Sequence, residues 1–508
     1  MLLHEFLATS VSQKPDKVAL VCENQTYTYA QLAQRVAQLA VELQRCGVAR
    51  GDRVALFLDN GVELVVGVFA ALVAGAVFMP VNPLTKADKL AYMLNDSRAA
   101  ALITHSSLAS VYEDALALNR TVRSCIVAGR GEGRDPRIVR YPEAKTGNSP
   151  APRDPGLIDQ DLAAIIYTSG STGDPKGVML THLNMVSAAR SVSTYLGLRD
   201  DDVIICVLPL AFDYGLYQLL MSVKVGATLV LEKSFTFPVK VLERMAQHKV
   251  SVFPGVPTIF SMLMNIGTLA SYDLHALRMI TNTAAALSEE HIRQLRGLFP
   301  QAQLFSMYGL TECKRVTYLP PEQLDIRPTS VGRGMPNEEV WLVDESGRRL
   351  PNGSTGELVI RGSNVMRGYW EKPEATAKRL RPGPIPGEMI LYSGDVFRTD
   401  EEGYLYFVAR KDDIIKSRGE KVSPREVENA LYALEGVYEA TVIGVPDPLL
   451  GQAVKAFVVL KQGYRYSERD VIKHCMGRLE NFMAPKYVEF VDALPKTDTG
   501  KIKKIGLA

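Results

Sequence analysis

Short apolar runs alternate with longer segments of helical periodicity through the first half of the chain. One example is an apolar run at 54–58, a helix-like segment at 62–75 and another apolar run at 76–81. Parallel strands need a crossover connection, usually a helix, so this order predicts a parallel sheet covered by helices. The same rhythm returns, each time followed by a helix-competent stretch, in the runs at 100–105, 124–129, 202–210, 227–232 and 250–255.

The pattern predicts an α/β protein whose large N-terminal domain has two α/β lobes. The segment 129–156 is rich in Gly, Pro and charged residues, and we expect a loop that joins the two lobes. After Trp341, short alternating strands with glycine turns predict a small β-rich subdomain. Beyond Arg410 the pattern resets to a mobile α+β domain of about 100 residues, a usual domain size. We therefore expect domains at 1–409 and 410–508.

The most apolar stretch, 62–81, carries Glu63 and two glycines. A membrane-spanning helix needs about 20 uninterrupted apolar residues, so we expect a buried helix that runs into a strand. The N-terminus lacks a basic segment followed by an apolar one, and Lys14 and Asp16 come too early for a signal peptide. We expect no stable membrane insertion and a cytoplasmic location.

Composition excludes several classes of protein. Of 508 residues, 47% are hydrophobic and 22% charged, which is typical of a globular chain and not of a disordered one. Lys and Arg number 58 against 56 Asp and Glu, and a net charge of +2 argues against nucleic-acid binding. The six cysteines are far apart with no CxxC pair, which indicates neither a zinc site nor a disulfide framework.

The window 165–182, IIYTSGSTGDPKGVMLTH, is the most informative for chemistry. A strand runs into a loop of small and hydroxyl residues, where backbone N–H groups can approach phosphate and a lysine supplies charge. It is not a GxxxxGK[ST] loop, because Pro175 stands where the second glycine would be. An ordinary Gly/Ser turn is the alternative. The candidate phosphate-binding residues are Thr168, Ser169, Gly170, Ser171, Thr172, Gly173 and Lys176.

YTSGSTGDPKGV resembles the phosphate-loop signature of the adenylate-forming superfamily, which includes acyl-CoA synthetases, peptide-synthetase adenylation enzymes and luciferases. The resemblance continues in order at 27–32, 72–83, 307–312, 356–362, 392–395, 410–428 and 495–501. It implies that the chain activates a carboxylic acid with ATP and Mg²⁺, releases pyrophosphate, and passes the acyl group from an acyl-adenylate to a thiol.

The resemblance also implies roles for single residues. Lys501 matches the catalytic lysine that bridges the substrate carboxylate and the α-phosphate. Glu312 matches the magnesium ligand, and Thr311 is expected to donate to the α-phosphate. Tyr308, beside Met307, is expected to stack on adenine, with a core aromatic as the alternative.

Further matched positions concern the ribose and the C-terminal domain. Asp395 matches the acceptor of the ribose hydroxyls and Arg410 the ribose-contacting arginine, although Ala409 replaces the family's usual glycine. Asp412 matches the hinge about which the C-terminal domain turns between the two half-reactions. The loop expected to face the site for thiol transfer, or to be an ordinary turn, comprises Arg418, Gly419 and Lys421.

By the same resemblance, the acid pocket is lined by Phe212, Asp213, Tyr214, Tyr217, Thr283, Lys314 and Arg315. Amino-acid-activating members have an aspartate where this chain has Asp213, and a buried carboxylate needs a cationic partner. We therefore predict an amino-acid substrate, with an ion pair between Asp213 and a nearby Lys or Arg as the alternative. Lys314 and Arg315 reach a second carboxylate of the acid, or a phosphate, or brace the pocket wall.

The acceptor follows from the acid. Only seven residues follow Lys501, and we expect the acceptor to come from outside the chain. An amino-acid substrate predicts a free-standing carrier protein with a phosphopantetheine thiol. An acyl or aryl acid predicts coenzyme A instead, and the remaining alternatives are a non-thiol acceptor and a binding protein without catalysis.

Overall fold

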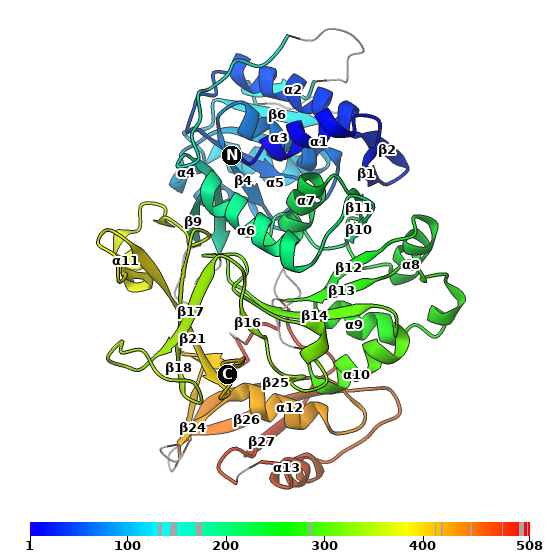
Figure 1. Cartoon of the computed structure of the whole chain (residues 1–508), viewed down its shortest axis with the longest axis vertical. Helices are drawn as coiled ribbons and strands as arrows, with labels where there is room; N and C mark the ends of the chain where they lie inside the picture. Colours follow the sequence, from blue (N-terminus) through cyan, green and yellow to red (C-terminus); the bar gives the residue numbers. More distant parts are fainter. Residues whose placement is uncertain are drawn as a thin grey trace.

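The computed structural model describes residues 1–130, 135–142, 150–168, 175–283, 287–411, 413–417, 420–447, 450–479, 481–496, 502–504 and 506–507, without the side chains of 416, 421 and 451. The first α/β lobe lies at the top of Figure 1 and the small C-terminal part at the bottom; between them, the β-rich part lies on the left, beside strands β12 to β14 of the second lobe on the right. The predicted fold class is confirmed.

The first lobe is built on an eight-stranded sheet in the order β19-β9-β8-β4-β3-β5-β6-β7. Strands β3 to β6 pair in parallel, as the strand–helix–strand pattern predicts. The strands are β3 (Arg53–Phe57), β4 (Val77–Val81), β5 (Ala99–His105), β6 (Ser124–Ala128), β7 (Ile138–Arg140), β8 (Leu162–Thr168), β9 (Lys176–Thr181) and β19 (Gly368–Tyr369). The helices are α3 (Val62–Val73), α4 (Ala87–Asp96) and α5 (Ala109–Ala117).

The second lobe is built on a nine-stranded sheet in the order β16-β15-β14-β13-β12-β10-β11-β1-β2. Its strands are β1 (Val18–Cys22), β2 (Gln25–Thr28), β10 (Val203–Cys206), β11 (Thr228–Leu231), β12 (Val252–Gly255), β13 (Met279–Asn282), β14 (Gln303–Tyr308), β15 (Thr317–Leu319) and β16 (Arg333–Gly334). Its helices, with those between the lobes, are α1 (Glu5–Gln13), α2 (Tyr29–Arg45), α6 (His182–Tyr195), α7 (Asp213–Val225), α8 (Pro238–Gln247), α9 (Pro257–Met264) and α10 (Glu289–Leu298).

The β-rich part and the C-terminal part each have a five-stranded sheet. The first comprises β17 (Glu338–Val343), β18 (Thr355–Gly362), β20 (Leu380–Pro382), β21 (Met389–Thr399) and β22 (Leu405–Arg410), with α11 (Pro373–Arg379). The second comprises β23 (Ile415–Ser417), β24 (Glu420–Val422), β25 (Val437–Asp447), β26 (Gly451–Leu460) and β27 (Tyr487–Phe490), with α12 (Pro424–Tyr432) and α13 (Glu468–Met476). The C-terminal part has a hydrophobic core of its own.

The segment 129–156 does not join the two lobes, and this prediction was wrong. It leads from β6 to β8, which belong to the same sheet, and it contributes the edge strand β7. A three-residue strand inside a polar segment is too short for an alternating pattern to reveal it. The chain passes between the lobes elsewhere, because α6 follows β9 of the first sheet and precedes β10 of the second.

Helix α3 is buried on all sides, since every residue from 64 to 72 is buried. The prediction of a buried helix that runs into a strand at 62–81 is therefore confirmed. In the described part of the chain, no helix has the length and apolar character needed to cross a membrane. All six cysteines are free, and Cys46 alone among them is partly exposed.

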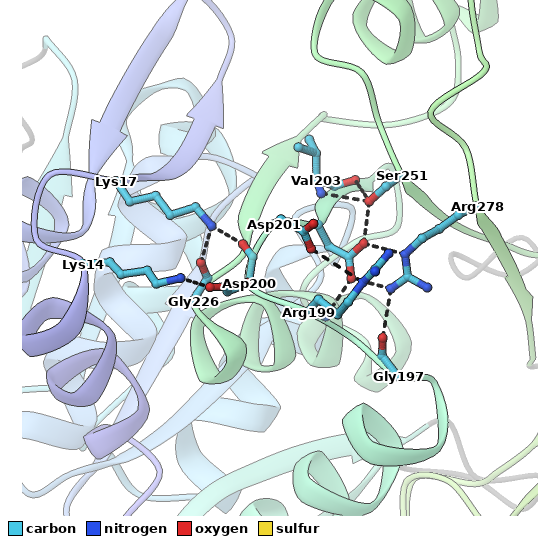
Figure 2. A network of polar contacts seen from close by, with 11 residues as sticks. Lys14, Lys17, Gly197, Arg199, Asp200, Asp201, Val203, Gly226, Ser251 and Arg278 are labelled. Atoms are coloured by element: carbon cyan, nitrogen blue, oxygen red, sulfur yellow. Dashed lines mark hydrogen bonds and ion pairs between the residues drawn. The ribbon is translucent and has the colours of Figure 1, made fainter.

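A polar network fastens the N-terminal segment to the second sheet (Figure 2). Lys17 Nζ donates to the Gly226 carbonyl at 2.6 Å and also contacts the Asp200 carbonyl. Beside it, the buried carboxylate of Asp202 accepts from Arg278 Nε at 2.8 Å and from Ser251 Oγ at 2.7 Å. The Lys17 contacts form only when β1 takes its place beside β11, whereas those of Asp202 join the segments that lead into β10, β12 and β13.

Candidate active site

Lys176 and Glu312, predicted on sequence segments more than a hundred residues apart, both lie next to Tyr369. The Tyr369 hydroxyl donates to Glu312 Oε1 at 2.6 Å, and Lys176 Nζ lies 5.7 Å from the centre of the Tyr369 ring. Strand β19 carries Tyr369 to this place, because its two residues pair with Met179 and Val178 of β9. Sequence reasoning missed Tyr369, since no pattern in a two-residue strand marks it.

Thr168 stands opposite Lys176 in the antiparallel pair of β8 and β9, and its hydroxyl lies 3.5 Å from the Lys176 carbonyl. The strands therefore bring both ends of the predicted phosphate loop together. The loop residues Ser169, Gly170, Ser171, Thr172 and Gly173 lie outside the described residues.

Glu312 fits the predicted magnesium site. Its backbone carbonyl accepts from Met366 N at 2.7 Å, which holds the turn after β14, and its Oε1 accepts from the Tyr369 hydroxyl. Among the described residues, no group of three or more His, Cys, Asp or Glu could hold a metal ion by itself. Mg²⁺ bound with a nucleotide commonly uses one or two carboxylates and takes its other ligands from phosphates and water, so a single carboxylate is a fitting donor.

Tyr308 and Asp395 are in direct contact, as the Tyr308 hydroxyl donates to Asp395 Oδ2 at 2.6 Å. Arg410 pairs with Asp395 in the register of β21 and β22. Burial raises the pKa of Asp395, while the Tyr308 hydrogen bond and the Arg410 charge oppose that rise. The Tyr308 ring packs edge-on against Phe397, with centroids 4.8 Å apart. The structure thus gathers three predicted nucleotide residues, and their adenine and ribose roles stay predictions.

In the acid pocket, Asp213 has a cationic partner within the chain. It is the first residue of α7, and its Oδ2 lies 3.7 Å from Nη1 of Arg315. The Arg315 guanidinium also lies over the ring of Tyr214, 4.6 Å from its centre. The Tyr214 hydroxyl in turn donates to the Thr281 carbonyl at 2.7 Å. An ion pair of Asp213 with a nearby Lys or Arg was the alternative to a substrate ammonium, and the structure has this pair.

Lys314, next to Arg315, is fully buried and has a left-handed backbone, with φ of +74°. Burial lowers the pKa of Lys314 to about 8, while the Asp213 and Glu312 charges oppose that shift. Lys314 Nζ has no hydrogen-bond partner among the described residues, and the same holds for Nε and Nη2 of Arg315. Two buried cationic side chains therefore keep unused donors.

The turn that carries these cations is held from behind by Asn364. Its side-chain amide donates to the carbonyl of Cys313 at 2.8 Å and contacts the carbonyl of Arg315 at 3.3 Å. Asn364 Nδ2 also lies 2.6 Å from Oε2 of Glu338. Burial raises the pKa of Glu338 well above its usual range, which favours the protonated form of this carboxyl. Neither residue was predicted from the sequence, because a buried polar pair has no periodic signature.

The remaining pocket residues also have definite surroundings. Phe212 caps the N-terminus of α7 without a side-chain hydrogen bond. Tyr217 is buried between helices and donates to the Met185 carbonyl at 3.3 Å, and the pKa of its hydroxyl is raised first by burial and then by Asp213. The buried hydroxyl of Thr283 has no partner among the described residues. Met307 Sδ accepts from the Tyr195 hydroxyl at 2.9 Å.

Several C-terminal predictions fall outside the described part of the chain, namely Lys501, Asp412, Arg418 and Gly419; Lys421 is described as part of β24 without its side chain.

The chain on either side of Lys501 is anchored to the C-terminal domain. Lys496 Nζ pairs with Glu439 at 2.7 Å, and Lys504 Nζ donates to Glu428 Oε1 at 2.8 Å. Lys496 also forms an isolated antiparallel bridge with Ile502.

Comparison with known proteins agrees with this architecture. The family model described as AMP-binding enzyme matches residues 7–370, and the model of the AMP-binding enzyme C-terminal domain matches 426–501. The chain is 37% identical to a feruloyl-CoA synthase of Amycolatopsis sp, over 94% of this chain and 92% of that protein. It is 32% identical to a long-chain-fatty-acid–CoA ligase of Bacillus subtilis, over 98% of this chain and 93% of that protein.

Among solved structures, the anthranilate CoA ligase AuaEII in complex with anthranoyl-AMP is similar, with a TM-score of 0.89 and 27% identity, covering 100% of this chain and 96% of that one. The chain belongs to the AMP-binding, adenylate-forming enzyme superfamily. It is an AMP-forming acid–thiol ligase that uses ATP to activate a carboxylic acid.

Proposed function

We propose that this enzyme is an acyl- or aryl-CoA synthetase, which joins a carboxylic acid other than an α-amino acid to coenzyme A. The observation that carries the proposal is the 3.7 Å contact between Asp213 and Arg315. A carboxylate that already faces a guanidinium binds a substrate ammonium poorly, because the two cations would repel each other in a low-dielectric pocket. The similarity of the chain to a feruloyl-CoA synthase and to an anthranilate CoA ligase supports the same proposal.

In the first half-reaction, a carboxylate oxygen of the acid attacks the α-phosphorus of ATP and pyrophosphate leaves. Two anions must meet, so fixed cations and donors have to offset their repulsion. We assign this task to Lys176 and Lys501, with Thr311 as a hydroxyl donor to the α-phosphate. Glu312 would hold a magnesium ion, which supplies charge neutralisation on the phosphate oxygens. Asp395 and Arg410 orient the ribose.

In the second half-reaction, the thiol attacks the acyl carbon, and AMP leaves. We propose that the domain 410–508 turns about Asp412 between the two steps, because Lys501 must be present for the first and the thiol arm needs room for the second. The loop of Arg418, Gly419 and Lys421 then faces the acyl-adenylate. The ion pairs of Lys496 and Lys504 with the C-terminal domain support this proposal, since they make the chain around Lys501 move with that domain.

The test has two stages. Pyrophosphate exchange into ATP is measured over aryl acids, fatty acids and α-amino acids, and each active acid is then offered coenzyme A or a carrier protein bearing phosphopantetheine. We expect exchange with acids that lack an ammonium group, and an acyl-CoA product identified by mass spectrometry. Exchange confined to one amino acid, followed by acylation of the carrier protein alone, overturns the proposal in favour of carrier loading. Adenylate formation without any thioester indicates a non-thiol acceptor.

A further inference from the structure

Two adjacent cationic side chains, Lys314 and Arg315, are buried at the acid pocket without hydrogen-bond partners for most of their donors. Lys314 is 0% exposed and Arg315 2% exposed. The donors without a partner among the described residues are Lys314 Nζ and Arg315 Nε and Nη2. Arg315 Nη1 donates to the Lys314 carbonyl at 3.3 Å and lies 3.7 Å from Asp213 Oδ2, so the guanidinium is held in place with one edge unused.

This arrangement is costly in the absence of a ligand. A buried cation without hydrogen bonds is strongly unfavourable, and a buried donor left unpaired costs free energy in its own right. Lys314 adds backbone strain, since its φ of +74° is a conformation that residues other than glycine rarely adopt. Strain and unpaired polar groups of this kind concentrate where a protein binds something.

The two cations have a single ion pair between them among the described residues. Among the described residues, Asp213 is the one carboxylate within ion-pair distance of Arg315, and Lys314 makes no ion pair. Glu338 lies behind the turn, where its Oε2 accepts from Asn364 Nδ2 at 2.6 Å. Glu312 Oε1 is bound to the Tyr369 hydroxyl. One anion placed between the two cations would give Lys314 Nζ and the unused edge of the Arg315 guanidinium the acceptor that they lack among the described residues.

A purely structural role for the cations is poorly supported. The turn from 313 to 315 is already held by Asn364, which contacts the Cys313 and Arg315 carbonyls, and by Tyr308, whose carbonyl accepts from Val316 N at 2.9 Å. Among the described residues, the Lys314 ammonium group makes no hydrogen bond to that turn. Removing the ammonium group would therefore leave the hydrogen bonds of the turn intact.

We propose that Lys314 and Arg315 form a binding site for a second anionic group of the acid, so that the substrate is a dicarboxylic acid or a carboxylic acid that carries a sulfonate or phosphonate. The inference rests on the proposed function and deepens it. One carboxylate of the substrate reacts at the α-phosphate, and the distal anion accepts from Lys314 Nζ and from the unused edge of the Arg315 guanidinium. A planar guanidinium suits a carboxylate, which it can bind with two parallel hydrogen bonds.

The experiment compares acids of matched shape by pyrophosphate exchange and by acyl-CoA formation. Terephthalate is compared with its monomethyl ester and with benzoate, adipate with its monomethyl ester, and para-sulfobenzoate tests a different anion. We expect kcat/KM for the dianionic acid to exceed that of its ester at least tenfold in one of the series. Lys314→Met and Arg315→Met should lower kcat/KM for the dianionic acid at least tenfold more than for its ester, so that the preference disappears. Arg348→Met, an exposed arginine with 81% side-chain exposure, serves as the matched control and should keep the preference.

The outcomes separate this inference from the proposed function. Equal or better activity on the monoacids, with acyl-CoA formed, overturns the anion site and leaves the CoA synthetase proposal intact. An equal loss on mono- and dianionic acids in Arg315→Met also overturns it, because the arginine then binds the reacting carboxylate. Absence of exchange with every acid that lacks an ammonium group contradicts the proposed function itself. If Lys314→Met does not fold, Lys314→Gly removes the cation and relieves the left-handed strain, and the same loss of preference is expected.

Discussion

Replacing Asp202 by Asn should lower the stability of the second lobe markedly. The Asp202 side chain is 1% exposed and bridges three segments: it accepts from Arg278 Nε at 2.8 Å and Nη2 at 2.5 Å, from Ser251 Oγ at 2.7 Å and from Arg199 N at 2.8 Å. The amide keeps the shape of the carboxylate and removes its charge. Arg278 would then face a neutral group that presents N–H donors to it.

The expected magnitude follows from burial. Breaking a buried ion pair by removing one partner costs about 3–5 kcal/mol, because the other charge is left uncompensated. Arg278 is 25% exposed, so water can partly solvate its charge. The expected loss of unfolding free energy is therefore near the lower end of this range, about 3 kcal/mol. The melting temperature of a domain of some 150–250 residues falls by about 2–4 °C for each kcal/mol of lost stability, and the lower value applies to larger units. A loss of about 3 kcal/mol should therefore lower the melting temperature by about 6 °C.

The assay is a thermal melt followed by circular dichroism, combined with hydrogen exchange of β10 and β12. The control is Asp201→Asn, one residue away, whose side chain is 73% exposed and pairs with Arg199 at 3.6 Å. An exposed pair contributes little, so the control should melt within about 1 °C of the native protein. Equal melting temperatures for the two variants, with unchanged exchange in β10, would refute the reasoning.

The remaining predictions concern catalysis, the acid pocket and pH. Lys501→Ala should reduce pyrophosphate exchange about 10²–10³-fold while transfer from supplied acyl-adenylate to the thiol stays largely intact, and an equal loss in both steps contradicts the assigned role. Asp213→Asn should raise the preference for terephthalate over benzoate about tenfold, because it removes a negative charge beside the cations; loss of all exchange instead would favour the ammonium-binding role. Burial lowers the pKa of His182 from 6.5 to about 4, and its Nδ1 accepts from Leu3 N at 3.0 Å. The folding stability that neutral His182 contributes is therefore fully present above pH 6.5 and is lost as the pH falls toward 4. Burial also lowers the pKa of His291 to about 4, so the stability lost between pH 7 and pH 5 in melting curves should become about 2 kcal/mol smaller in His182→Asn without vanishing, and should be unchanged in the exposed-site control His275→Asn.

The sequence determined the class of fold and the class of chemistry. Alternation of apolar runs with helical segments is a local property, so it predicted β3, α3 and β4 nearly to the residue. The phosphate-loop segment around Lys176 and the ordered motifs that follow were sufficient to predict an ATP-dependent, acid-activating enzyme, which the family match confirms. These signals are readable because each lies within a short stretch of chain.

The tertiary structure decided which charges meet. Asp213 alone indicated a substrate ammonium, and only folding brought Arg315 within 3.7 Å of it from a distant segment. In the same way, Glu312 and Tyr369 come together through the pairing of β19 with β9, and β1 joins the sheet of the second lobe. Such contacts depend on the packing of remote elements, and the energy of a buried charge depends on what surrounds it, which no local pattern encodes.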